Sequence, residues 1–265
     1  MTAFALAASF AAAAGIAAWR ARALSASGAI AAFAVGTAVF GCGGWPAAAV
    51  LFAFFIPSVA LSRVGKARKR ALADTGKQGP RDAWQVLANG GVAAACAVLA
   101  PTLAPPWNAV LSAAFAGAFA AASADTWGTE IGTLAPSSPR SILTFRPIAA
   151  GLSGGITRAG TAATLAGAAA VALVARLAGV APFLPVALGG VAGAFFDSLL
   201  GASAQALRWC PRCERACETD PHACGTPSVL RRGLAWMEND AVNLAATLCG
   251  AAVAALLCAT RTGSP

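Results

Sequence analysis

The sequence has 265 residues, of which 58% are hydrophobic and only 11% are charged, and it carries a net charge of +9. A soluble globular domain carries about 25% charged residues, so a chain this poor in charge could not cover its own surface in water. The positive charge does not indicate a nucleic-acid partner, because no aromatic interleaving and no nucleic-acid motif accompanies the basic residues. The composition therefore predicts a protein whose solvent is the lipid bilayer.

Long stretches of the chain contain no charged residue, and they predict helices that cross the membrane. They are residues 1–19, 23–62, 83–124, 177–196 and 241–260. One crossing needs about 20 apolar residues, so the two longest stretches can each cross twice. Glycine and proline interrupt these two stretches at residues 41–46 and 101–106, which favours a helical hairpin in each.

Eight helices follow, at residues 2–19, 28–42, 46–62, 83–100, 108–127, 159–177, 184–207 and 238–259. The first stretch lacks a basic segment before its apolar run, so a retained helix is favoured over a cleaved signal peptide. No segment shows the alternation of apolar and polar residues that is typical of strands, so the sequence does not indicate a β-barrel. The expected fold is an all-α polytopic membrane protein with one membrane domain over residues 1–265.

The basic residues assign a side to the loops. Seventeen of the 19 lie after the first, third, fifth and seventh helices: Arg20, Arg22, Arg63, Lys66, Arg68, Lys69, Arg70, Lys77, Arg81, Arg140, Arg146, Arg158, Arg208, Arg212, Arg215, Arg231 and Arg232. By the positive-inside rule these loops are cytoplasmic and both termini lie outside, as expected in a bacterial inner membrane. Three cytoplasmic loops result: a basic loop (63–82), whose basic run at residues 63–70 suits anionic headgroups, a glycine-containing loop (132–158) and a Cys/His loop (208–237).

Acidic side chains within apolar helices are costly, and three of them mark a candidate site. Asp125 and Glu130 lie at the cytoplasmic end of the fifth helix, and Asp197 lies inside the seventh. At 100° per residue, Asp197 shares a stripe about 80° wide with Gly190, Gly193 and Gly201, so a neighbouring helix or a ligand can approach it closely.

Two further helices present polar groups at the same side of the membrane. Asn89 follows Asp82 and Gln85 on one face of the fourth helix, and Asn239 and Asn243 open the eighth. Each amide taken alone is explained by hydrogen bonding between helices, and each acid by a solvated helix end. Taken together, four helices that bring acids or amides to one leaflet predict a shared site.

Carboxylates beside amides suit Mg²⁺, which prefers oxygen ligands and bridges substrate phosphates. We expect Asp125, Glu130 and Asp197 to hold this metal and to be catalytic. Arginines and a glycine-rich helix start favour anions, so substrate phosphates are assigned to Arg146, Arg158 and the backbone of Ser153, Gly154 and Gly155. Asn89, Asn239 and Asn243 complete the predicted substrate-binding set, and the site indicates phosphoryl transfer.

The Cys/His loop contains one compact cluster of metal ligands. Cys210, Cys213, His222 and Cys224 can supply four ligands to Zn²⁺, with Cys217 as an alternative ligand. Disulfides are disfavoured in a reducing cytoplasm. Structural zinc and free or redox-active thiols remain open alternatives.

Four segments, taken in order along nearly the whole chain, resemble the domain of unknown function 92 family. These segments are residues 125–132, 153–155, 197–205 and 239–243, and the most specific of them contains Asp-Ser-Leu-Leu-Gly at its start. The resemblance implies a membrane-embedded kinase-like fold, distantly similar to CTP-using polyprenol kinases, in a family that includes a plant phytyl-phosphate kinase. It also implies that Asp125, Glu130, Asp197 and Asn243 lie at the active site. Gly128 and Leu152 depart from the family pattern, which leaves their loop contacts open.

The leading interpretation is a Mg²⁺-dependent transferase that phosphorylates an isoprenoid lipid monophosphate, with CTP, ATP or GTP entering from the cytoplasm. The alternatives are an ion- or proton-coupled transporter and a non-catalytic assembly protein. A transporter site is expected near the midplane of the bilayer, whereas these polar groups gather in one leaflet.

Overall fold

The computed structural model describes residues 2–65, 69 and 79–262. Within this part, the helices are α1 (Thr2–Arg20), α2 (Ala26–Arg63), α4 (Ala83–Leu99), η2 (Ala100–Thr102), α5 (Trp107–Gly132), α6 (Arg158–Leu177), α7 (Phe183–Ser203) and α8 (Asn239–Thr262). The strands are β1 (Arg140–Ser141), β2 (Gly155–Ile156), β3 (Leu207–Cys210), β4 (Arg215–Cys217) and β5 (Val229–Arg232). Most of the predicted basic loop, with Lys66, Arg68, Arg70 and Lys77, lies outside the described residues.

The predicted helices at 28–42 and 46–62 form the two arms of α2. Gly44 breaks the helix, with φ 63° and ψ −160°, inside the predicted interruption. A straight helix of 38 residues would be about 57 Å long. Instead, Arg63 at the end of α2 donates a hydrogen bond of 3.1 Å to the carbonyl oxygen of Ala21, shortly before α2 begins. The two ends of α2 therefore lie at the same side of the molecule, and its arms form a hairpin.

The largest other differences from the predicted boundaries are at the ends of α5 and α7. Helix α5 continues to Gly132 rather than ending at residue 127, because no proline occurs before Pro136 and Gly128 is tolerated within the helix. Helix α7 ends at Ser203 rather than at 207, because Leu207 pairs with Arg232 as the first residue of β3. The longer α5 makes Glu130 a helical residue, one and a half turns beyond Asp125.

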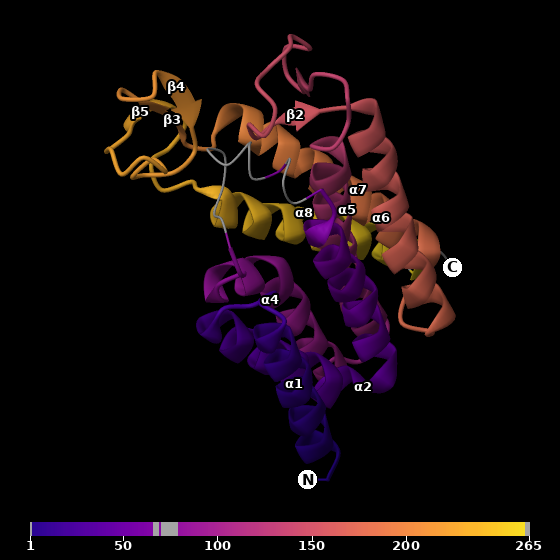
Figure 1. Ribbon diagram of the computed structural model, residues 1–265. Helices are drawn as coiled ribbons and strands as arrows, with labels where there is room; N and C mark the ends of the chain where they lie inside the picture. Colours follow the sequence, from indigo (N-terminus) through magenta and orange to yellow (C-terminus); the bar gives the residue numbers. More distant parts are fainter. Residues whose placement is uncertain (1, 66–68, 70–78, 263–265) are drawn as a thin grey trace.

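The expectation that the chain has no strands was wrong for the loops. Strands β1 and β2 pair antiparallel, and β3 lies between β4 and β5 in a three-stranded sheet. These strands have only two to four residues, too few to show alternation in the sequence. Figure 1 shows β2 and the three-stranded sheet at one end of the molecule and the N-terminus at the opposite end.

Helix α5 is the central helix of the bundle, in contact with α2, α4, α6, α7 and α8. Its middle is built from small residues that let neighbouring backbones approach, which stabilises helices in lipid. A Cβ on Gly193 of α7 would lie 2.5 Å from that of Ala121 of α5, and one on Gly117 would lie 2.6 Å from the Gly250 carbonyl oxygen of α8. The glycines of the stripe that contains Asp197 thus pack against neighbouring helices. This agrees with the first of the two predicted alternatives, the close approach of a neighbouring helix rather than of a ligand.

Six of the described helices are long and apolar enough to cross a membrane, and α1 contributes a shorter apolar helix. The hairpin α2 is one of the six. The predicted class, a mostly helical integral membrane protein, agrees with this architecture.

Candidate functional site

A polar cavity of about 1270 Å³ lies among the loops and the ends of α2, α4, α5, α6, α7 and α8. Nine of the eleven residues predicted for the phosphoryl-transfer site line it: Asn89, Asp125, Glu130, Ser153, Gly154, Gly155, Asp197, Asn239 and Asn243. Arg146 and Arg158 are exposed and are not among its lining residues. Residues that are far apart in the sequence therefore share one cavity.

Asp125 and Asp197 are brought together by the packing of α5 against α7. Their carboxylates are close enough to interact electrostatically. The Oδ2 atom of Asp197 is buried and has no hydrogen-bond partner among the described residues. A buried carboxylate oxygen without a partner is energetically costly, and a cation with oxygen ligands would offset that cost.

Glu130 is engaged differently from the two aspartates. Its carboxylate forms an ion pair with Lys69, and both side chains are largely buried. Among the described residues, the three carboxylates do not form a group of ligand atoms close enough to hold one metal; only the Cys/His cluster does so. Asp125 and Asp197 therefore remain as the pair that could share a cation, with Glu130 neutralised beside them.

Among the residues that the structure describes, the basic residues that line the cavity are Arg22, Arg63, Lys69 and Arg81. Lys69 pairs directly with Glu130, whereas the guanidinium of Arg81 interacts electrostatically with both Glu130 and Asp125. Burial lowers the pKa of Arg81 and the two carboxylates act in the opposite direction, but an arginine stays charged at neutral pH. The cavity thus combines acidic groups with fixed positive charge.

The sequence places Arg81 in the basic cytoplasmic loop but does not indicate that it lines the cavity. Backbone hydrogen bonds to the segment before α2 hold Arg81 in this position. Arg81 donates a hydrogen bond to the carbonyl oxygen of Ala23, and its own carbonyl accepts one from Ser25, each at 3.0 Å. A Cβ at Gly28 would lie 2.1 Å from the Arg81 carbonyl oxygen, so a glycine is required there. No local spacing could have indicated this contact between segments more than 50 residues apart.

Two of the three polar residues predicted at the start of α4, Asp82 and Gln85, have a structural role. Asp82 and Gln85 form a capping box, with reciprocal hydrogen bonds of 3.0 Å between side chains and backbone amides. Asn89 donates to the carbonyl oxygen of Gln85 and faces the cavity. At the start of α8, Asn243 is half-buried and Asn239 is exposed at the rim.

The glycine-rich loop binds a carboxyl group of the chain itself, that of Glu218. The Ser153 amide donates to Glu218 over 2.7 Å and the Ser153 hydroxyl over 2.9 Å. Gly154 has φ +80°, and a Cβ there would lie 2.5 Å from the backbone nitrogen of Ala202. The loop therefore packs against α7, and the Ser153 amide binds a carboxylate of the chain itself. Glu218 and Gln205, whose side chains also bond each other, are site neighbours that sequence reasoning missed.

Burial raises the pKa of Glu218 to about 7, against the opposing hydrogen bonds from Ser153 and the nearby charge of Arg232. Glu218 lies outside the membrane-spanning helices, directly after β4. Among the described residues of the Cys/His loop, Glu218 is the one whose side chain forms hydrogen bonds to a residue of the cavity.

The comparisons with known proteins agree with this architecture. The model of the family described as "Integral membrane protein DUF92" matches residues 9–251. Protein PGR of Arabidopsis thaliana is 33% identical over 72% of this chain and 75% of its own. An uncharacterized membrane protein of Methanocaldococcus jannaschii is 31% identical over 78% of this chain and 74% of its own, and one of Synechocystis is 25% identical over 84% and 78%. No solved structure matches the chain.

Proposed function

Because the chain belongs to the DUF92 family of integral membrane proteins, we propose that it is a Mg²⁺-dependent phosphotransferase acting on an isoprenoid lipid monophosphate. The observation that carries the proposal is the buried, unpartnered carboxylate oxygen of Asp197, in a large polar cavity that Asp125 and Arg81 also line. A divalent cation fits this position, because Mg²⁺ is commonly held by one or two carboxylates together with substrate phosphates.

Asp125 and Asp197 would hold the metal, which would neutralise phosphate charge when bound. This assignment leaves Glu130 as a partner of Lys69 rather than as a direct ligand. Phosphates would bind to Arg81, because Lys69 is already paired with Glu130. Arg146, Arg158 and the Ser153 amide, which the sequence had suggested for this role, are exposed or engaged by Glu218.

The reaction is a single displacement. An oxygen of the lipid monophosphate attacks the terminal phosphorus of the nucleotide, and the bond from that phosphorus to the bridging oxygen breaks. A nucleoside diphosphate leaves, and the lipid becomes a diphosphate. Fixed positive charge at Arg81 would stabilise the transferring group, in the way that basic side chains do in other phosphoryl-transfer sites.

An apolar cavity beside the polar one supports a lipid substrate. It lies among α1, α2 and α4 and is lined by aromatic residues that include Phe10, Phe40 and Trp45. Arg81, Gln85 and Asn89 line both cavities. An amphipathic molecule could therefore place its phosphate in the polar cavity and its tail among the aromatic side chains.

We also propose the membrane topology that the basic residues predict. Each arm of α2 would cross the bilayer once, and α1 would also cross, so that eight spans place both termini outside and the polar cavity on the cytoplasmic side of a bacterial inner membrane.

The test is incubation of the purified, detergent-solubilised protein with Mg²⁺, labelled CTP, ATP or GTP, and isoprenyl monophosphates of increasing chain length. We expect labelled isoprenyl diphosphate with at least one nucleotide, and loss of product when the metal is chelated. Proteoliposomes from the same preparation are assayed for ion and substrate flux. Flux without any phosphoryl transfer would replace the kinase by a transporter, and absence of both would favour an assembly role.

A further inference from the structure

Four metal-ligating side chains converge in the loop between α7 and α8, outside the polar cavity. The ligand atoms of Cys210, Cys213, His222 and Cys224 all lie within 4.8 Å of one another. The sulfur atoms of Cys210 and Cys224 are 3.6 Å apart, and Nδ1 of His222 is 3.1 Å from the Cys224 sulfur. In a tetrahedral zinc site with bonds of about 2.3 Å, neighbouring sulfurs lie about 3.8 Å apart, so the side chains already approach that arrangement.

The backbone around these residues has the form of two tight ligand-bearing turns. The first follows β3, where the Cys213 amide donates to the sulfur of Cys210 over 3.4 Å. The second contains His222 and Cys224, and the Cys224 amide lies 3.4 Å from Nδ1 of His222. The Cys213 amide, which is directed at the Cys210 sulfur, stabilises the thiolate form, and the thiolate is the form that binds a metal. Cys210 and His222 are buried, whereas Cys213 is exposed.

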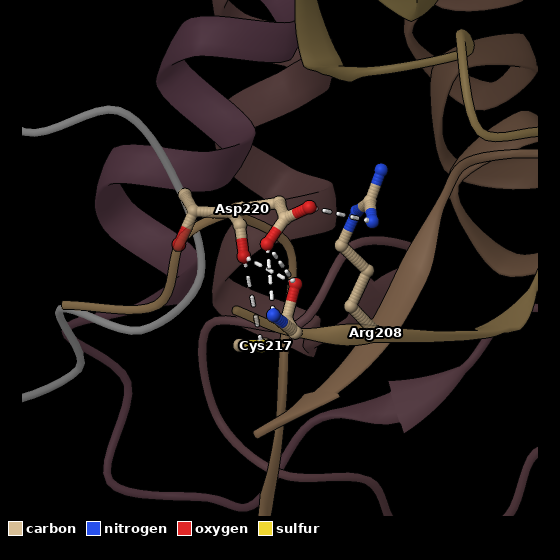
Figure 2. A network of polar contacts seen from close by, with 5 residues as sticks. Arg208, Cys217 and Asp220 are labelled. Atoms are coloured by element: carbon tan, nitrogen blue, oxygen red, sulfur yellow. Dashed lines mark hydrogen bonds and ion pairs between the residues drawn. The ribbon is translucent and has the colours of Figure 1, made fainter. Parts of the chain in front are cut away.

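A polar network holds the second turn against the sheet, as Figure 2 shows. The Asp220 carboxylate accepts hydrogen bonds from the amide and hydroxyl of Ser228, at 2.8 and 3.0 Å, and forms an ion pair with Arg208 at 3.3 Å. The Cys217 sulfur lies 3.8 Å from the carbonyl oxygen of Thr219 in the same network. Cys217 therefore belongs to the frame and is not a member of the ligand cluster. We call residues 207–232, with these two turns, the Cys/His module.

The Cys/His module is attached to the polar cavity through Glu218. This residue follows β4 and lies between the two ligand turns in the sequence. Its carboxylate accepts both hydrogen bonds of Ser153 and a third, of 3.2 Å, from Gln205. The module has only three short strands, which cannot form a core large enough to fold stably without a further constraint such as a metal.

We propose that Cys210, Cys213, His222 and Cys224 bind one structural Zn²⁺, and that the zinc-bound module positions Glu218 to order the glycine-rich loop of the polar cavity. Four protein ligands leave no open coordination position, so the metal is structural rather than catalytic. Glu218 is a positioning residue in this account. The proposal does not depend on the reaction performed in the cavity.

The zinc content of the full-length protein, purified in detergent without chelators, tests the site. We expect about one zinc per chain in the wild type, as for other structural sites. Cys210→Ser and Cys224→Ser should lose the metal, whereas the matched control Cys217→Ser should keep it. Metal-free wild-type protein, or a Cys210–Cys224 disulfide in freshly purified protein, would overturn the proposal. Zinc loss in Cys217→Ser with retention in Cys213→Ser would overturn the ligand assignment.

Hydrogen exchange of the wild-type protein tests the link to the cavity without relying on variants that fail to fold. Chelator that strips the zinc should increase exchange over residues 150–157, and Glu218→Gln should increase it in the same segment while zinc stays bound. Added Zn²⁺ should restore protection in the wild type. Unchanged exchange at residues 150–157 after complete zinc removal would show that the module and the loop are independent.

Discussion

The polar cavity and the Cys/His module meet at Glu218, but they are assembled in different ways. The cavity gathers Asp125 from α5, Asp197 from α7 and Arg81 from the segment before α4, so its chemistry depends on helix packing across most of the chain. The ligands of the module all come from 15 consecutive residues, 210–224. A long-range site is sensitive to any change in helix packing, whereas a local site depends mainly on its ligands and on the turns that carry them.

The largest expected effect follows from removal of the charge at Asp197. Asp197→Asn should reduce phosphoryl transfer by at least about 100-fold, because one preorganised electrostatic group is commonly worth that much. The measurement is turnover with labelled nucleotide at saturating lipid phosphate. Glu214→Gln, an exposed change in the Cys/His module, is the control and should stay within about twofold of the wild type. Equal turnover in Asp197→Asn and wild type would contradict the proposal that phosphoryl transfer takes place in the polar cavity.

A smaller loss is expected at Arg81. Arg81→Gln should reduce turnover by about 10- to 100-fold, because the substrate phosphates lose a fixed charge and the acids lose their counterion. Arg146, the phosphate-binding arginine that the sequence predicts, is exposed and does not line the cavity. Arg146→Gln should therefore change turnover by less than about twofold. Reversal of this order would restore the assignment made from sequence.

Glycine substitutions separate packing from backbone strain. Gly154→Ala combines a positive φ with a 2.5 Å approach to Ala202, and should destabilise the protein by about 2–4 kcal/mol. Gly179 has φ +70° with no neighbour within 4 Å, so Gly179→Ala should show only the strain, about 1 kcal/mol. Thermal unfolding in detergent measures both. Similar midpoints for the two variants would mean that the glycine-rich loop does not pack tightly against α7.

The smallest expected effect is a pH dependence that belongs to Glu218. Its pKa is raised from 4.5 to about 7 in the folded protein, so its contribution to stability is complete below about pH 4.5 and is lost as the pH rises through 7. The unfolding midpoint of the wild type should therefore fall, relative to that of Glu218→Gln, by a few °C between pH 5 and pH 8. A constant difference between the two proteins over this range would contradict the buried position of Glu218.

Prediction from sequence succeeded where the signal was local. Absence of charge located the helices, the glycine and proline interruption located the break at Gly44, and the conspicuous spacing located the Cys/His cluster. The apolar helices also allowed Asp197 to be singled out, since a carboxylate is conspicuous among them.

Prediction failed where the signal was a contact between distant segments. Arg81 reaches the acids because its backbone pairs with residues 23–25, and Glu218 reaches Ser153 across 65 residues of sequence. Arg146 was selected as a basic residue near glycines, but it follows a tight turn at residues 141–145 and lies exposed at the surface. Composition indicates which groups are present on one side of a membrane, but only packing determines which of them meet.

The central claim is that Asp125 and Asp197, from different helices, hold one divalent cation between them. Titration of the purified protein with Mn²⁺ as a spectroscopic substitute for Mg²⁺, followed by electron paramagnetic resonance, tests it directly for wild type, Asp125→Asn, Asp197→Asn and the double variant. We predict that the wild type binds Mn²⁺ at one site and that Mg²⁺ displaces this Mn²⁺. Either single change should weaken Mn²⁺ binding about as much as both together, since the effects of coupled ligands are non-additive. Independent, additive losses, or unchanged Mn²⁺ affinity in either single variant, would contradict the claim.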